Sequence, residues 1–149
     1  MPAHQTLTLR AVVTRHQGLF TDYATIVPEK AQQFMKRLQE VDHHASIEVA
    51  IFEPHRGDDH TEGHFFVGTL VSKQPDHPPA GMEYMEFTRD FAYSRGTIED
   101  IGTLHLQLND WMQQEKLVFD YSGYIVEMYF PTETGEEVEI YLPVKNTSS

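Results

Sequence analysis

An internal repeat constrains the fold of this chain more than any other feature of its sequence. Residues 47–54 align with residues 124–131, and in both segments a run of strand-forming residues ends at a proline. Each segment continues through a polar, glycine-containing loop into another strand-like run. In this alignment Ala50 corresponds to Glu127. One copy alone is small, so we expect the two copies to pair about a pseudo-twofold axis and bury more apolar surface together.

The pattern of apolar residues predicts the same order of elements in both copies: strand, helix, strand, strand. In the first copy the strands are expected at residues 7–14, 47–52 and 64–72. In the second they are expected at residues 82–93, 124–130 and about 138–142. The sequence therefore predicts an α+β fold of duplicated β-α-β-β modules, with antiparallel sheets, two helices and a central cleft along the seam. We expect a single domain over residues 1–149, with repeat 1 at about 5–73, a linker at 74–81 and repeat 2 at about 82–145.

The two helices carry recognisable start signals. Pro28 suits the first turn of a helix, and His43 and His44 are expected to close that helix. Thr97, with Asp100 three residues later, resembles a capping box at the start of the second helix. The apolar stripes have helical spacing, at Ala31, Phe34, Met35, Leu38 and Val41 in the first helix and at Ile101, Leu104, Leu108, Trp111 and Met112 in the second.

Composition excludes several classes of function. The chain has 149 residues, a formal net charge of −12 and no cysteine. The charge argues against direct nucleic-acid binding, which needs clustered Lys and Arg, and is compatible with a cationic ligand. The absence of cysteine excludes disulfides and thiolate chemistry. No signal peptide or apolar run of about 18 residues is visible, so we expect a cytoplasmic protein that does not enter a membrane.

Glu127 is the residue that most invites a functional interpretation. In the strand at 124–130 it alternates onto the same face as Ile125 and Tyr129, and the other face is apolar as well. Both faces are therefore expected to be covered by other parts of the protein. A carboxylate with so little water around it is unfavourable unless it has a hydrogen-bond donor, a cationic partner or a shifted pKa. Glu127 is either a candidate binding site or a strand glutamate on a face that is hydrated.

The histidines of the polar loop do not form a metal-binding motif. His55, His60 and His64 lie close to several carboxylates, but a zinc protease needs His-Glu-x-x-His on a helix. Here the residues fall in a glycine-containing hairpin, where His at i and i+4 need not converge. We expect a solvated loop, no metal site and no cofactor, because phosphate-binding and dinucleotide-binding motifs are absent too.

Taken as a whole, the chain resembles the GyrI-like effector-binding domain, a small-molecule-binding module that is also fused to AraC-type and MerR-type DNA-binding domains. The resemblance rests on order and spacing over roughly the whole chain and is clearer in the second half. The residues that carry it are the aromatic strand 83–87, the segment 96–101, the helix that ends in Trp111, the strand holding Glu127 and the closing strand 137–145.

This resemblance implies two strand-helix-strand-strand (SHS2) modules around an aromatic cleft. It also implies that a buried glutamate, here Glu127, meets lipophilic cationic ligands, as in multidrug-binding regulators. The sequence departs from the family in two respects: it has no DNA-binding domain, and residues 89–96 replace a short Gly-Pro turn between strand and helix. We expect that longer turn to alter one wall of the cleft.

Five further residues are candidates for contact with the ligand. Tyr129 shares a strand face with Glu127, and Phe52 is its approximate counterpart in the first repeat. Phe91 and Tyr93, in the extended turn, are expected wall residues. Trp111 lies on an apolar helical stripe, which favours a place in the core over stacking on a ligand, although one ring edge can face a cleft.

Three functions remain open at this point. The first is binding of hydrophobic, cationic or electrophilic small molecules for sensing, sequestration or detoxification. The second, which the resemblance implies, is hydrolysis of strained, cyclopropanoid-type genotoxins without a cofactor, with Glu127 as general base or water-orienting group. The third, implied by the resemblance, is inhibition of a larger protein such as DNA gyrase through the acidic surface. The identity of the ligand and the oligomeric state stay open.

Overall fold

The computed structural model describes residues 2–133 and 135–145, and in them the element order is strand, helix, strand, strand, twice. The first copy comprises β1 (Ala3–Leu19), η1 (Phe20–Asp22), α1 (Tyr23–Met35), η2 (Leu38–Glu40), β2 (His44–Phe52) and β3 (Glu62–Val71). The second comprises β4 (Glu83–Thr97), η3 (Ile98–Asp100), α2 (Ile101–Gln114), β5 (Ile125–Thr132) and β6 (Gly135–Pro143). The predicted α+β fold of duplicated modules is confirmed.

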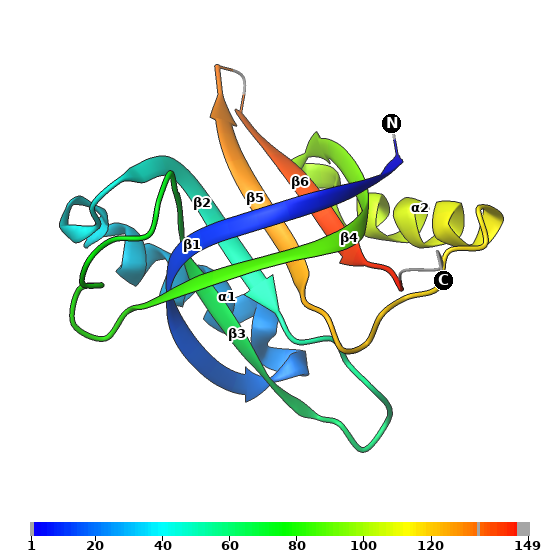
Figure 1. Ribbon diagram of the computed structural model, residues 1–149. Helices are drawn as coiled ribbons and strands as arrows, with labels where there is room; N and C mark the ends of the chain where they lie inside the picture. The colour runs from blue at the N-terminus through cyan, green and yellow to red at the C-terminus, as the bar shows by residue number, and fades with distance from the viewer. Residues whose placement is uncertain (1, 134, 146–149) are drawn as a thin grey trace.

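The strands close into an antiparallel barrel in the order β1-β3-β2-β5-β6-β4 (Figure 1). This order is the same read from either copy, since β1-β3-β2 of the first is mirrored by β4-β6-β5 of the second. The copies meet along β2–β5 and along β1–β4. In the β2–β5 ladder Ala50 is the direct partner of Glu127. Ala50 and Glu127, which occupy equivalent positions in the two copies, are therefore also neighbours in space. The pseudo-twofold axis passes between them.

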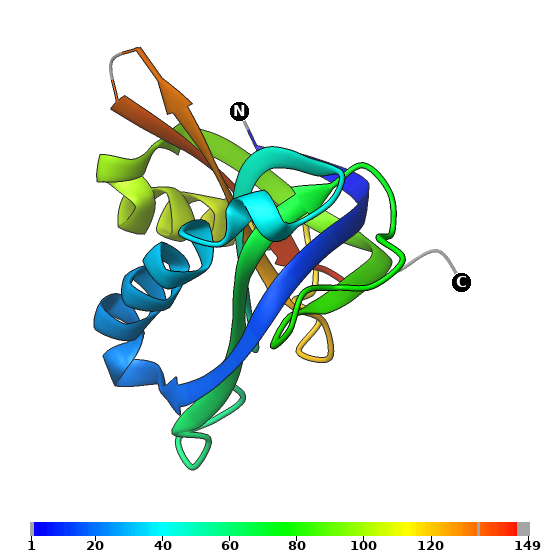
Figure 2. The same ribbon diagram turned by 90° about the vertical axis from the view of Figure 1, so that its left-hand side faces the viewer.

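The period-2 alternation of the strands divides the apolar side chains into inner and outer sets. The inner set fills the barrel and includes Val49, Ile51, Val126 and Met128. The outer sets form two further cores, one under α1 around Phe34 and Phe65 and the other under α2 around Leu108 and Met112. Figure 2 shows both helices on the same side of the barrel. In the described part of the chain, neither helix is long and apolar enough to cross a lipid bilayer.

The first helix begins earlier than its proline predicts. α1 starts at Tyr23, directly after the turn η1, so Pro28 lies inside the helix. Proline has no N–H and cannot pair with the carbonyl of Ala24 one turn earlier, but the helix continues because Val27, Ala31 and Phe34 are buried against the sheet. The expectation that His43 and His44 close this helix was wrong. α1 ends at Met35, His43 has a positive φ of 64° in a turn, and His44 begins β2.

The expected turn at residues 89–96 was wrong too. These residues continue β4, which is 15 residues long. They form a strand because both edges find partners: β4 pairs with β1 along one edge and with β6 along the other, and Phe91 is paired on both sides. The polar residues Arg89, Asp90 and Arg95 look loop-like in sequence, but they lie on a continuous strand in which Phe91, Ala92 and Ser94 are buried.

The capping box expected at Thr97 and Asp100 does not form. The Thr97 hydroxyl donates to the Asp100 carboxylate over 3.0 Å, and neither side chain caps a backbone N–H of the helix. A turn of 3-10 helix, η3, intervenes and moves the start of α2 to Ile101.

Candidate functional site

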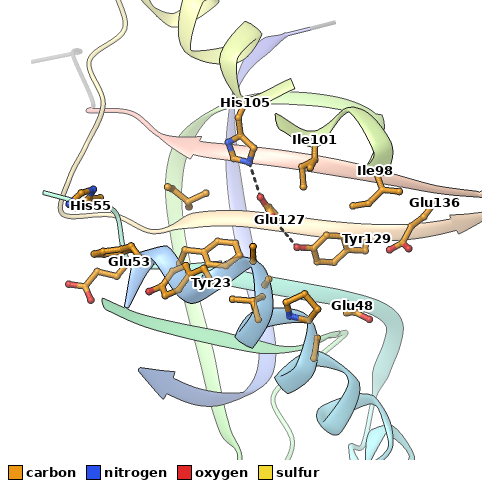
Figure 3. Close-up of a pocket in the computed structure, with 18 residues that line it drawn as sticks. Tyr23, Glu48, Glu53, His55, Ile98, Ile101, His105, Glu127, Tyr129 and Glu136 are labelled. Atoms are coloured by element: carbon orange, nitrogen blue, oxygen red, sulfur yellow. Dashed lines mark hydrogen bonds and ion pairs between the residues drawn. The ribbon is translucent and has the colours of Figure 1, made fainter. Parts of the chain in front are cut away.

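The candidate site is a pocket of about 580 Å³ on the seam between the two copies. Its floor is the outer face of β2 and β5, and its walls are α1 on one side and η3 with α2 on the other (Figure 3). A volume of this size falls within the range of pockets that hold drug-sized ligands. The lining residues are Phe20, Tyr23, Ala24, Val27, Pro28, Ala31, Glu48, Ala50, Phe52, Glu53, His55, Ile98, Ile101, His105, Ile125, Glu127, Tyr129 and Glu136.

The floor is apolar because alternate residues of two adjacent strands point out of the barrel on the same side. Ala50 and Phe52 of β2 lie opposite Glu127 and Ile125 of β5. Directly opposite residues have Cβ atoms about 4.5–5.5 Å apart, so the small side chain of Ala50 leaves open space beside the Glu127 carboxylate. The two helices rise on either side of this strip and leave the space between them uncovered.

Glu127 is almost completely buried, with 8% of its surface exposed. Both of its carboxylate oxygens have protein partners (Figure 3). The hydroxyl of Tyr129 donates to Oε1 over 2.5 Å, and Nε2 of His105 lies 2.7 Å from Oε2. An imidazole N–H at that position donates to the carboxylate. The Glu127 carboxylate is therefore held by two hydrogen-bond donors, Tyr129 and His105. Both donors can be neutral, so they fix the position of the carboxylate without neutralising its negative charge.

Tyr129 remains a donor over the whole physiological range of pH. Burial raises its pKa well above the usual value, and the negative charge and hydrogen bond of Glu127 raise it further. A neutral phenol can donate only one hydrogen bond, and here it goes to Glu127. Tyr129 thus fixes one oxygen of the carboxylate in the pocket.

Two more carboxylates, Glu48 and Glu136, line the pocket beside Tyr129. Burial raises the pKa of Glu48, and the nearby charge of Glu136 adds to the effect. Among the described residues, neither has an ion pair within 4.0 Å. Both carboxylates therefore add negative charge to the lining of the pocket, in addition to that of Glu127.

Glu53 has a different environment, although it lines the same pocket. Burial favours its neutral form, but hydrogen bonds from the backbone N–H of His64 and from Arg56 lower its pKa overall. Its charge is compensated by Arg56 within the protein. No Lys or Arg occurs among the described residues that line this pocket.

Three of the six residues expected at the site line the pocket: Glu127, Tyr129 and Phe52. Phe91 is completely buried inside the barrel, because its stretch of chain is a paired strand. Tyr93 packs beside that inner core, where its hydroxyl donates to Glu139 over 3.1 Å. Trp111 packs against the core under α2 and does not line the pocket.

The sequence interpretation missed His105, Tyr23 and the pair Glu48 and Glu136. His105 had a usable signal, since it follows Ile101 by four residues and precedes Leu108 by three on the apolar face of α2. Tyr23 was missed because α1 was expected to begin later. Glu48 alternates with buried residues of β2 and reads as an ordinary solvent-facing position.

Two of the three histidines that were expected in the polar loop lie beside Glu53. His60 Nε2 and His64 Nδ1 lie 3.4 and 3.5 Å from its two oxygens, and the ring of His55 lies 4.8 Å from that of Phe20. Among residues 2–133 and 135–145, no three His, Cys, Asp or Glu side chains are grouped so that they could hold a metal ion.

Comparison of the sequence with family models and with curated proteins gives no match. Solved structures do resemble this one. SAV2435 bound to tetraphenylphosphonium superimposes with a TM-score of 0.72 at 13% identity, over 98% of this chain and 94% of that one. The C-terminal domain of EcmrR gives 0.61 at 12% identity, over 99% and 98%. A hydrolase from Listeria innocua gives 0.54 at 11% identity, over 97% and 91%. These neighbours are consistent with a GyrI-like fold.

Proposed function

We propose that this protein binds hydrophobic, cationic small molecules in the pocket between α1 and α2, where Glu127 recognises the positive charge. The observation that carries the proposal is a buried carboxylate, held by Tyr129 and His105, in a pocket of about 580 Å³ with mostly apolar walls. Binding of this kind serves sensing, sequestration or detoxification.

The apolar walls supply affinity for the body of the ligand. Burial of apolar surface contributes roughly 25 cal/mol per Å², and the side chains of Phe52, Val27 and Ile101 offer such surface. Rings of a ligand can also stack against Tyr23 and Phe52, whose centroids lie 5.9 Å apart. Neutral and charged ligands of the same shape gain equally from these contacts.

The carboxylates supply selectivity for charge. A buried negative charge attracts a cation strongly because little water screens it, and it disfavours an anion for the same reason. Glu48 and Glu136 extend this field beyond Glu127, whereas Glu53 is compensated by Arg56. The structural neighbour SAV2435 carries tetraphenylphosphonium, a lipophilic cation, which makes that ion a suitable probe.

Thermal unfolding tests the proposal. Tetraphenylphosphonium and tetraphenylborate have nearly the same shape and opposite charge. The cation at 100 times its dissociation constant is expected to stabilise the wild type by about 2.7 kcal/mol, which raises the midpoint by roughly 5–10 °C. The borate should give no comparable shift.

A matched pair of variants locates the effect. Glu127→Gln should lose most of the shift, whereas Glu115→Gln, which removes the same charge from an exposed position on the protein surface, should keep it. An equal shift with both ions, or a full shift in Glu127→Gln, would overturn the proposal.

The same geometry also favours a second function, hydrolysis of a strained cyclopropane that is activated by a carbonyl. Glu127 would take a proton from water, the water oxygen would bond to a ring carbon, and the ring C–C bond would break. The displaced electron pair would be protonated by the Tyr129 hydroxyl, and the short Tyr129–Glu127 hydrogen bond would return the proton. The likeness in fold to the Listeria innocua hydrolase supports testing it.

Turnover separates the two functions. Accumulation of ring-opened product beyond one equivalent, lost in Glu127→Gln and reduced in Tyr129→Phe, would support hydrolysis. Binding without product would support binding alone. Inhibition of a larger protein through the acidic surface stays a prediction, which a salt-sensitive interaction that survives Glu127→Gln would support.

A further inference from the structure

The pocket contains two histidines with different surroundings. His105, on the apolar face of α2, has its Nε2 2.7 Å from Oε2 of Glu127. His55 lines the same pocket, but its ring lies against Phe20 and His60, and it has no carboxylate within 4.0 Å among the described residues. His105 can therefore form an ion pair with Glu127 when it is protonated, whereas His55 is too far from any described carboxylate to do so.

The protonation state of His105 decides the net charge that the pocket presents. A neutral imidazole donates Nε2–H to Glu127 and leaves the pair with one negative charge. An imidazolium makes the same hydrogen bond and brings the pair to zero. Glu127 is buried among apolar side chains, so there is little water to screen its charge. The electrostatic potential in the pocket therefore differs strongly between these two states.

A cationic ligand prefers only one of these states. Next to the neutral imidazole it meets an uncompensated carboxylate. When His105 is protonated, the ligand meets an ion pair with no net charge. It also meets the positive charge of the imidazolium, which lines the same pocket and repels it. Resting on the cation binding proposed above, we propose that a proton on His105 and a cationic ligand compete for the charge of Glu127. His105 thereby determines the pH at which the pocket accepts a cation, and bound cation and bound proton exclude each other.

Several other titratable groups line the pocket around His105. From β5 these are Glu127 and Tyr129, from β2 and the loop after it Glu48, Glu53 and His55, from β6 Glu136, and from α1 Tyr23. On its own helix Asn109 donates to the backbone carbonyl of His105 and not to its ring. The group that complicates a pH series is Glu48, whose pKa is raised by burial and by Glu136.

The sign of the effect follows from linkage. If the cation binds the form with neutral His105, binding releases a proton wherever the free protein carries one there. The affinity then falls as the pH falls, by up to about tenfold per pH unit, within the range of about pH 5 to 8 in which histidines titrate. Protonation of Glu48, whose pKa is raised by burial, lowers affinity in the same direction, so its contribution has to be measured separately.

Isothermal titration with tetraphenylphosphonium tests this inference. Titrations at several values between about pH 5.5 and 8.5, in buffers with different enthalpies of ionisation, give both the affinity and the number of protons released. The wild type should lose affinity at least tenfold across the series and release protons at its acidic end. His105→Gln, which keeps an N–H donor for Glu127, should show nearly constant affinity and no proton release.

Two control variants assign the effect to His105. His55→Gln removes the other imidazole of the pocket. Whatever its affinity at alkaline pH, it should show the same relative loss of affinity and the same proton release at acidic pH as the wild type. Glu48→Gln should keep a loss of affinity with falling pH, because that loss arises from His105. In the wild type, the ring chemical shifts of His105 at acidic pH should report loss of its proton when the cation is added, a readout that needs no variant.

The outcomes separate this inference from the proposed function. Tight binding with the same affinity at every pH, or a full pH response in His105→Gln, would overturn the competition and leave cation binding intact. Absence of binding at every pH would overturn both. A ring that stays protonated when the cation is bound would also overturn the competition.

Discussion

Ala50 and Glu127 are direct partners in the ladder between β2 and β5, and they are also the residues that correspond in the two copies of the repeat. Two equivalent positions that meet on a pseudo-twofold axis would carry the same side chain in a perfect repeat. Two glutamates there would repel each other, and two alanines would leave no charge. The asymmetric pair gives one carboxylate and the space beside it, so the molecule has a single charged site on its axis.

Ala50→Leu should weaken binding of a lipophilic cation. Ala50 is 1% exposed at the surface of the protein and lies on the floor of the pocket, so a larger side chain would occupy the space next to the Glu127 carboxylate. We expect at least a tenfold loss of affinity for tetraphenylphosphonium by titration calorimetry, with about 1–3 kcal/mol of destabilisation from overpacking. Ala50→Gly should retain the affinity. Unchanged affinity in Ala50→Leu would mean that the ligand does not reach this floor.

Glu48→Gln should stabilise the protein without ligand. Its raised folded-state pKa means that the charged form is less favourable in the folded than in the unfolded chain. This penalty is absent at acidic pH, where both states are protonated, and develops as the pH rises through the ordinary glutamate range to the raised value. We expect a gain of up to about 1 kcal/mol at neutral pH, small because water partly screens the carboxyl, and no gain below about pH 4.

Urea unfolding of Glu48→Gln at pH 7 and at acidic pH checks this prediction. A gain of equal size at both pH values would show that it does not arise from the charge of Glu48. Affinity for the cation should decrease in the same variant, because one of the carboxylates in the pocket is lost.

Tyr129→Phe should destabilise the protein while leaving its shape. The phenol donates to the buried Glu127 carboxylate, and a hydrogen bond to a charged group contributes about 1.5–3 kcal/mol. We expect a loss of that size in urea unfolding at neutral pH. Addition of tetraphenylphosphonium should recover part of it, because the cation supplies the carboxylate with another partner. A loss that the cation does not reduce would place the ligand away from Glu127.

The orientation of α2 can be tested with two leucines that lie two residues apart. Leu108 is 0% exposed and packs against β4 and β6, whereas Leu106 is 68% exposed. Leu108→Ala should cost about 2–5 kcal/mol and Leu106→Ala less than about 0.5 kcal/mol in urea unfolding. His105 directly precedes Leu106 in the same helix, so a reversed order would mean that the helix presents a different face and that His105 does not reach Glu127.

The sequence predicts the fold well because apolar residues recur with the period of a strand or of a helix over most of the chain. The internal repeat also gives the order of elements twice. It fails where tertiary pairing overrides local composition. Residues 89–96 look like a turn, but residues 89–93 pair with β1 and residues 91–96 pair with β6, which carries Phe91 into the barrel and Tyr93 to its inner core.

The candidate site was only partly predictable for a similar reason. Glu127 stands out as the lone acid in an apolar strand, and its neighbours Tyr129 and Phe52 follow from alternation. His105 comes from another element, and although it lies on the predicted apolar face of α2, its contact with Glu127 depends on how that helix packs on the sheet. No local pattern in the sequence encodes that packing.

The most direct test of the account is the difference in affinity between tetraphenylphosphonium and tetraphenylborate, measured by calorimetry at one ionic strength and above pH 8. For the wild type we predict tighter binding of the cation by at least about 30-fold, which corresponds to about 2 kcal/mol or more from a buried charge. In Glu127→Gln the two affinities should come within a few fold of each other, with Glu115→Gln unchanged from the wild type. Equal affinities in the wild type, or the same preference in Glu127→Gln, would contradict the claim that Glu127 recognises positive charge.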